Sequence, residues 1–228
     1  ACMYTPFGTG QINQTIWIDL NLMIPGWRQQ LINNTQYIDA KFDIADLQIT
    51  NEGVSWNEIQ ANRILFCDGI ASMENPYFKM LPFAPNKGEA LIVEIKDLPN
   101  QAIYKNNMTI VPWKDQLFWV GSNYDWEFTD TKPSIDFRNK MEMALRQLLK
   151  IPFIVVDHIA GIRPANQERR PFVGLHPSYP AIGICNGMGT KGCSLAPYFA
   201  HQLIAHCEQG SPIHPEASLE RFEQILKK

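Results

Sequence analysis

The sequence lacks three features that would assign a protein to a class at once. No apolar run reaches the roughly 18 residues that a membrane-spanning helix requires. The formal net charge of −3 gives no basic excess for nucleic acid or an acidic membrane surface. The start, Ala1 to Tyr4, has no basic segment followed by an apolar one, so we expect no signal peptide there. Nucleic acid and a transmembrane segment are therefore not expected.

Cysteines are few and carry no metal-binding pattern. There is no CxxC pair and no Cys/His cluster with zinc spacing, so we expect no metal site. An odd number of thiols without a framework is typical of reduced cysteines in a cytoplasmic protein. We therefore expect a cytoplasmic chain with five structural thiols: Cys2, Cys67, Cys185, Cys193 and Cys207.

The first third of the chain alternates between predicted strands and a helix. Residues 15–20 resemble a short strand, and residues 21–33 have apolar side chains at helical spacing, although Pro25 interrupts them. Residues 42–50 and 54–56 predict an antiparallel pair around the turn Asn51-Glu52-Gly53. The apolar run 61–69 predicts a strand buried on both faces, as in a parallel sheet.

The middle of the chain has a different pattern, which is typical of antiparallel strands. Residues 90–95, 108–111 and 116–120 predict strands of an antiparallel sheet. Ser134 is a capping residue for a helix that Pro152 ends.

In the last third, predicted strands and helices alternate again. Residues 153–156 and 181–185 predict short strands, and residues 194–207 predict a helix that Gly210 stops. Two α/β blocks flanking a β-rich block indicate two interleaved domains in a mixed α/β fold.

The clearest motif is the glycine loop, Gly187-Met188-Gly189-Thr190-Lys191-Gly192, between a predicted strand and a helix. Glycines allow close backbone approach, and a helix amino terminus offers free N–H groups to an anion. The rest of a dinucleotide-binding unit does not follow, because neither a second strand nor an acid about twenty residues on is present. Taken by itself, the loop is explained equally well as a turn whose glycines only allow tight packing between strand and helix.

Several segments in order resemble the D-amino-acid oxidase, glycine oxidase and sarcosine oxidase-like family of FAD-dependent oxidoreductases. Residues 61–69 resemble its strand ending in glycine beside the flavin. The most specific element is Gly161-Ile162-Arg163-Pro164, followed by Pro171-Phe172-Val173-Gly174, and the glycine loop is similar to the final flavin-contacting loop. The other matching segments are residues 85–91, 109–112 and 118–122.

The resemblance implies a partial FAD-binding sheet domain interleaved with an antiparallel β-sheet substrate domain. The substrate domain would comprise residues 1–38 and 76–152, and the FAD-binding remainder residues 39–75 and 153–228. The family's amino-terminal βαβ unit, which holds the ADP half of FAD, has no counterpart in the sequence. We therefore expect a truncated chain that binds FAD weakly or not at all, with exposed apolar sheet surface that a dimer could cover.

The resemblance also implies the site residues. Gly69, Gly187, Met188, Gly189, Thr190, Lys191 and Gly192 carry over as flavin contacts, with a solvated loop lysine as the alternative for Lys191. Arg163 carries over as a clamp for a substrate carboxylate, because a guanidinium forks onto a carboxylate; the alternative is an arginine that ties down its loop.

The implied chemistry is oxidation of a C–N bond of an amine or amino acid by hydride transfer to flavin, with no side-chain acid or base. The competing interpretations are a non-catalytic binding or scaffold domain and a subunit whose FAD unit lies on another chain. His158 could face the flavin or be structural. Cys2-Met3-Tyr4-Thr5 resembles the tetrapeptide around the flavin-linked cysteine of sarcosine oxidases, but its amino-terminal position makes coincidence the preferred interpretation.

Overall fold

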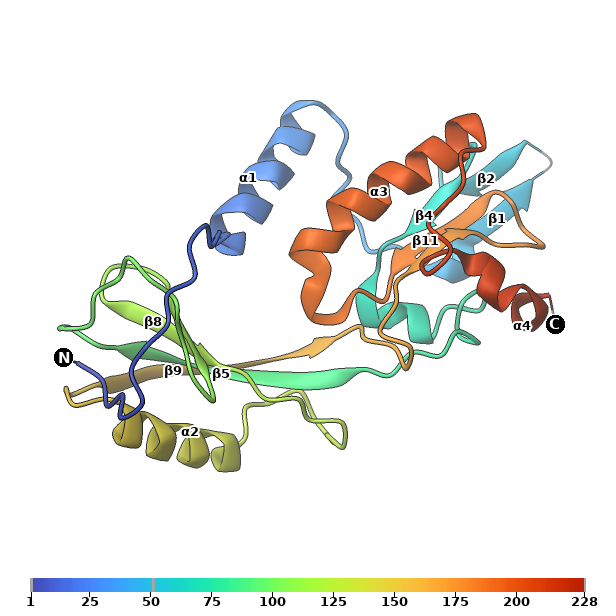
Figure 1. Cartoon of the computed structure of the whole chain (residues 1–228). Coiled ribbons are helices and arrows are strands. Elements are labelled where there is room, and N and C mark those ends of the chain that lie inside the picture. The colour runs from blue at the N-terminus through green and yellow to red at the C-terminus, as the bar shows by residue number, and fades with distance from the viewer. Residues whose placement is uncertain (1, 51, 228) are drawn as a thin grey trace. The chain divides into compact units, whose positions relative to one another are not determined.

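The computed structural model describes residues 2–50 and 52–227 and divides into two compact units. The first unit comprises Ala1–Tyr37 and Asn86–Ile162, and the second Ile38–Pro85 and Arg163–Lys228. Asn51 of the predicted turn and the two terminal residues lie outside the described residues. The boundaries expected from the sequence lie at 38/39, 75/76 and 152/153. Each unit is built from two chain segments, which Figure 1 lets the reader follow.

The first unit is built on a five-stranded sheet in the order β6-β7-β8-β5-β9. Adjacent pairs among β5, β6, β7 and β8 are antiparallel, as the alternation in residues 90–120 predicts. Apolar side chains of β5, β7 and β8, including Leu91, Ile110 and Phe118, form a fully buried core against the helix α2. The strands are β5 (Asn86–Glu94), β6 (Tyr104–Lys105), β7 (Thr109–Pro112), β8 (Leu117–Gly121) and β9 (Ile154–Arg163).

The helix α2 (Ile135–Leu148) begins where its sequence predicts. The Ser134 hydroxyl accepts a bond from the Phe137 N–H at 3.3 Å and donates to Glu89 of β5 at 2.7 Å. Because Phe137 and Leu145 face the sheet, the cap and the apolar face fix the same orientation of the helix.

Residues 15–19 are not a strand, so that prediction was wrong. The Asp19 carboxylate instead accepts a bond from the Asn21 N–H at 2.9 Å and starts the helix α1 (Leu20–Asn33). No residue of α1 is buried, and it continues through Pro25. The apolar residues before it, such as Ile16 at 84% exposure, have no neighbouring strand among the described residues to pair with.

The second unit contains two three-stranded sheets. The first has the order β10-β11-β4, in which β11 is antiparallel to β10 and parallel to β4. The long helix α3 runs along this sheet (Figure 1) and packs Phe199 and Leu203 against it. The elements are β4 (Ile64–Phe66), β10 (Phe172–Leu175), β11 (Ile182–Asn186) and α3 (Gly192–Gln209), with the short helices η2 (Gly69–Met73), η3 (Gly189–Lys191), η4 (Leu219–Phe222) and α4 (Glu223–Leu226).

The other sheet of this unit is the meander β1-β2-β3, which follows the short helix η1 (Ile44–Asp46). The predicted pair is present, with Ile49 opposite Val54. The predicted strand 42–50 is wrong over its first half, because residues 44–46 form η1 and only 47–50 pair with β2. The meander strands are β1 (Leu47–Thr50), β2 (Gly53–Trp56) and β3 (Ile59–Ala61).

Further strand and helix boundaries differ from the predictions. The run 61–69 holds only the short β4, whose one buried residue is Phe66, because β4 is the edge strand of its sheet. β9 is far longer than residues 153–156 and extends the first unit's sheet, since it pairs along β5. The helix α3 starts at Gly192 rather than 194, and Gly210 ends it in the left-handed conformation, as predicted.

The predicted mixed α/β fold with several sheets is confirmed. No helix of the described residues is long and apolar enough to cross a membrane.

Candidate functional site

Two glycine turns meet at one edge of the second unit's sheet. Gly69 follows β4 and Gly187 follows β11, and these two strands run parallel. The carboxyl ends of parallel strands lie at the same sheet edge, where ligands of α/β proteins bind. Both glycines adopt positive φ, 62° and 77°, which side chains disfavour. The sequence order of strand and glycine therefore places both turns together.

The side chain of Asn186, the last residue of β11, joins these turns. Its amide nitrogen donates to the Gly69 carbonyl at 2.7 Å and to the Ser72 hydroxyl at 2.9 Å. Its amide oxygen accepts from the Gly187 N–H at 2.8 Å. Because Asn186 is buried, these bonds satisfy its polar atoms and fix the backbone of both turns.

A second buried asparagine attaches the GxRP segment to the glycine loop. The Asn166 amide nitrogen donates to the Gly187 carbonyl and to the Arg170 carbonyl, each at 2.7 Å. In addition, the Gly189 N–H donates to the Pro164 carbonyl at 3.3 Å. The structure thus brings the segment after Arg163 against the glycine loop.

The glycines of the loop differ in why they are needed. A Cβ on Gly187 would lie 2.9 Å from the Asn166 amide nitrogen and 3.0 Å from the Phe172 ring, so no side chain fits. Gly189 has a positive φ of 54°. At Gly192 and Gly69 a Cβ would meet nothing within 4 Å, so these two positions face open space. Packing explains Gly187, but it does not explain Gly192.

The amino terminus of α3 has no side-chain cap. Lys191 occupies the N-cap position without a capping bond, and the first turn has no acidic residue. The first N–H groups of a helix have no partner within the helix, and they carry a partial positive charge. An electron-rich ring edge or an anion can therefore accept bonds here. The uncapped end, the open space at Gly192 and the two glycine turns together fit the ring end of a flavin.

The remaining predicted residues occupy different surroundings. Met188 packs partly buried against the α3 core, whereas Thr190 and Lys191 are exposed. Arg163 is the last residue of β9, half-buried, and its carbonyl accepts from the Ala165 N–H at 2.8 Å. Its neighbour in the sequence, Pro164, contacts the glycine loop.

His158 lies in the first unit, on β9, where it contacts Glu89. Its Nε2 is 3.0 Å from the Glu89 carboxylate, and its ring stacks on Phe137. Burial holds the pKa of His158 below its ordinary value, even though Glu89 opposes that shift. Glu89 also accepts from the Ser134 hydroxyl and lies 3.9 Å from the Lys87 ammonium. These contacts give His158 a structural role within its unit.

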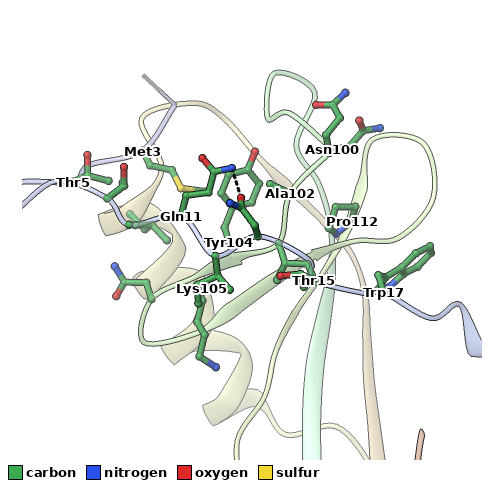
Figure 2. A pocket seen from close by; sticks show the side chains of 18 of the residues that line it. Met3, Thr5, Gln11, Thr15, Trp17, Asn100, Ala102, Tyr104, Lys105 and Pro112 are labelled. Carbon is green, nitrogen blue, oxygen red and sulfur yellow. Dashed lines mark hydrogen bonds between the residues drawn. The ribbon is translucent and has the colours of Figure 1, made fainter. Parts of the chain in front are cut away.

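A cavity of about 1040 Å³ lies elsewhere in the first unit, between the segment 3–17 and the loops at 100–115. Figure 2 shows that amide and hydroxyl side chains such as Gln11, Asn100 and Tyr104 line it together with apolar ones such as Met3 and Trp17. The Gln11 amide donates to Asn13 at 3.0 Å. Neither Arg163 nor the glycine loop lines it. The volume of this cavity therefore does not identify the candidate site.

Sequence reasoning missed Asn166 and Asn186, although each stands close to a residue it singled out. For Asn186 the available signal was its position directly before a glycine turn, because an amide both donates and accepts. Its partners lie up to 117 residues away in the chain, from Asn186 to Gly69, and the sequence does not reveal them.

Comparisons with known proteins agree with this arrangement. The glycine oxidase of Bacillus subtilis (strain 168) is 31% identical over 149 residues, which are 61% of this chain and 39% of that protein. The glycine oxidase of Pseudomonas aeruginosa is 26% identical over 156 residues, 66% of this chain and 43% of that protein. The chain thus spans about two fifths of these relatives.

Solved structures show the same fold. The iminodiacetate oxidase of Chelativorans sp. BNC1 matches with a TM-score of 0.63 at 20% identity, covering 78% of this chain and 51% of that one. The glycine oxidase of Geobacillus kaustophilus matches with a TM-score of 0.62 at 19% identity, covering 77% and 51%.

The family model described as FAD dependent oxidoreductase, DAO, matches residues 30–206. That range contains Gly69, Arg163 and the whole glycine loop. The resemblance drawn from the motifs is confirmed, and the chain belongs to the DAO family of FAD-dependent oxidoreductases.

Proposed function

We propose that this chain is the flavin- and substrate-contacting part of an oxidoreductase that oxidises the C–N bond of an amine or amino acid. The observation that carries the proposal is the junction of two glycine turns through Asn186 beside the uncapped start of α3. The names of the relatives, glycine oxidase and iminodiacetate oxidase, support an amino-acid-like substrate.

The proposed flavin contacts are Gly69 and the glycine loop, chiefly through backbone. When bound, the flavin accepts a hydride from the carbon that carries the substrate nitrogen. The first N–H groups of α3 would donate to the ring edge where negative charge develops on reduction, and so stabilise the reduced state. Lys191 is exposed and can add positive charge near the same end.

Arg163 is the proposed substrate clamp. The sequence places it directly before Pro164, whose carbonyl accepts from the Gly189 N–H. A guanidinium can hold a carboxylate with two parallel bonds, and a charged hydrogen bond contributes about 1.5–3 kcal/mol. Arg163 would therefore orient an amino acid without taking part in proton transfer.

Three further assignments belong to the proposal. The first unit would bind substrate and the second would hold the flavin. A dimer would cover the free edge of β4, which lies at the end of its sheet. The cytoplasm is the proposed location, as predicted from the reduced thiols.

Gly192 offers a test that separates flavin binding from folding. A side chain at Gly192 meets nothing within 4 Å, and a glutamate in the first turn of a helix is favourable for the helix. We expect Gly192→Glu to keep the unfolding midpoint while weakening the binding of a flavin ring about tenfold or more, measured by quenching of riboflavin fluorescence. Gly192→Gln is the matched neutral control and should bind more tightly than Gly192→Glu. Equal binding by both variants and the wild type would show that α3 does not face the ring.

Arg163 is tested with carboxylate ligands in the flavin-loaded protein. We expect Arg163→Leu to weaken binding of a small carboxylate, followed by the flavin absorbance, by about 10- to 100-fold. Arg163→Lys should recover only part of the affinity, because an ammonium cannot fork. Unchanged carboxylate affinity in Arg163→Leu would assign Arg163 to its loop instead. A longer form of the protein that contains the family's βαβ unit and still rejects flavin would favour the non-catalytic scaffold.

A further inference from the structure

Two cysteines lie side by side next to the glycine turns. The parallel register pairs Leu65 with Gly183 and Phe66 with Ile184, so Cys67 and Cys185 are the next pair along β4 and β11. Register partners in parallel strands point to the same face. The pair Leu65 and Gly183 shows this directly, because a Cβ on Gly183 would lie 2.6 Å from a Leu65 methyl carbon.

The spacing of such a pair suits a disulfide. Neighbouring strands lie about 4.8 Å apart, within the roughly 4.4–6.8 Å that separates the Cα atoms of bonded cysteines. Cys67 lies just beyond the last residue of β4, so its backbone is not held by the ladder and can adjust. Cys185 in β11 is the fixed partner.

The two thiols also differ in reactivity. Hydrogen bonding from Cys185, chiefly from its thiol and to a smaller extent from its backbone, lowers the pKa of Cys67 to about 7 against the opposing effects of burial and Asp68. The bond between the two thiols raises the pKa of Cys185, which keeps its proton. Cys67 is exposed and Cys185 partly buried, so an oxidant reaches Cys67 first.

We propose that Cys67 and Cys185 form a redox-active dithiol that low-molecular-weight disulfides oxidise to an intramolecular disulfide. Cys67 is the attacking residue and Cys185 the resolving one. This site is independent of the flavin chemistry proposed above, and it assigns a chemical role to two thiols that the sequence analysis expected to be structural.

The reaction proceeds by two exchanges. The Cys67 thiolate attacks one sulfur of the small disulfide, forms a mixed disulfide and releases the first small thiolate. Cys185 then loses its proton to solvent and attacks the Cys67 sulfur, which releases the second small thiolate. Two electrons pass from the dithiol to the small disulfide, which leaves as two thiols.

The position of the bond gives it a consequence. Cys67 and Cys185 stand two residues before Gly69 and Gly187, the two turns that the Asn186 side chain joins by hydrogen bonds. The disulfide would link the same two chain segments covalently. Oxidation should therefore restrict the movement of one glycine turn relative to the other.

Peptide mapping after oxidation tests the pairing. The chain is incubated with excess glutathione disulfide at pH 7, alkylated and digested with trypsin. Cys67 falls in the peptide 64–79 and Cys185 in the peptide 170–191, each with a single cysteine. We expect these two peptides to be joined, and Cys193→Ser, an exposed thiol of the same unit, to leave the yield unchanged. Glutathione retained on Cys67 without the joined peptide, or pairing of Cys67 with another cysteine, would overturn the proposal.

Alkylation rates test the role of the Cys185 thiol without requiring a disulfide. We expect Cys67 to react with iodoacetamide at pH 7 about fivefold more slowly in Cys185→Ala, because the donor that stabilises its thiolate is gone. A far-ultraviolet circular dichroism spectrum and an unfolding curve establish that the variant is folded. Equal Cys67 rates in the folded variant and the wild type would refute the attacking role of Cys67.

Discussion

At the scale of single residues, the candidate site depends on side chains that hold backbone rather than on side chains that face a ligand. Asn186 and Asn166 are both buried. Asn186 donates to the Gly69 carbonyl and accepts from the Gly187 N–H, and Asn166 donates to the Gly187 carbonyl. A buried polar group left without a partner costs about 1–3 kcal/mol. We therefore expect the shape of the glycine turns to depend on these amides.

Replacing Asn186 should test that dependence. We expect Asn186→Ala to lower the unfolding free energy of the second unit by about 2–4 kcal/mol, since the Gly69 carbonyl and the Gly187 N–H lose their partner. Urea unfolding followed by circular dichroism measures the change. Asn62→Ala, an exposed asparagine of the same unit, is the control and should change stability by less than about 0.5 kcal/mol. A midpoint for Asn186→Ala equal to that of the control would contradict the role of Asn186.

His176 predicts a pH dependence of the second unit. It is buried beside Tyr77 and Phe78, and burial holds its pKa below the ordinary 6.5. The unfolded chain then binds a proton more readily, so stability is complete above pH 6.5 and falls as the pH drops below it. We expect the unfolding free energy to fall between pH 7.5 and 5.5. The slope should correspond to the uptake of at most about one proton by this residue on unfolding.

The variant His176→Gln isolates this contribution. At pH 7.5 the variant differs from the wild type in packing and in the bond that His176 accepts from the Ser178 N–H at 3.1 Å. The difference in unfolding free energy between the two proteins should narrow at pH 5.5, because glutamine does not titrate. A difference that stays constant over this range would show that His176 is not the titrating group.

Residue types revealed the glycines of the site but not the residues that hold them. Gly187 was identifiable because it begins the glycine loop, and Gly69 because it ends the segment that resembles the family's strand beside the flavin; both adopt the positive φ that glycine supplies. Asn186 was not, because its bond to Gly69 joins positions 117 residues apart. The proximity of Cys67 and Cys185 was hidden for the same reason, since it depends on a parallel register.

At the scale of elements, α2 shows how a local cap is also a tertiary contact. Ser134 caps the helix through the Phe137 N–H and at the same time donates to Glu89 on β5. Glu89 is 2% exposed, so its carboxylate depends on Ser134, Lys87 and His158 for polar partners.

We expect Ser134→Ala to destabilise the first unit by about 2–3 kcal/mol, more than the roughly 1 kcal/mol of an ordinary helix cap. The excess comes from the buried Glu89 carboxylate, which loses a donor. Thermal and urea unfolding measure the effect. Ser134→Thr retains the hydroxyl and should recover most of the stability. If Ser134→Ala lowers the stability only as much as the loss of an ordinary helix cap, the Glu89 carboxylate does not need the Ser134 hydroxyl.

Elements with a strong local signal were predictable, and those set by neighbours were not. The cap and apolar face of α2 and the left-handed Gly210 after α3 are local properties. Residues 15–19 have strand-like side chains but no neighbouring strand among the described residues, so no ladder forms. The length of β9 depends on β5 beside it, and the apolar run 153–156 revealed only its first residues.

At the scale of the whole molecule, the chain combines two units with separate cores and only part of a family member's length. In the proposal, the glycine turns and the start of α3 hold the ring end of a flavin, and this sequence offers no phosphate-binding motif for the adenosine diphosphate half. Binding should therefore be governed by the ring alone.

This expectation can be measured by comparing two flavins that share the ring. If the described residues hold only the ring, FAD and riboflavin should bind the chain with dissociation constants within about threefold of each other, because the adenosine half adds no contact. Isothermal titration or fluorescence quenching gives both constants, and Gly192→Glu should weaken both by the same factor. If FAD binds more than about 100-fold more tightly than riboflavin, a gain of about 2.7 kcal/mol, the chain holds the adenosine diphosphate half as well. That result would overturn the prediction of weak FAD binding while leaving the ring contacts at α3 intact.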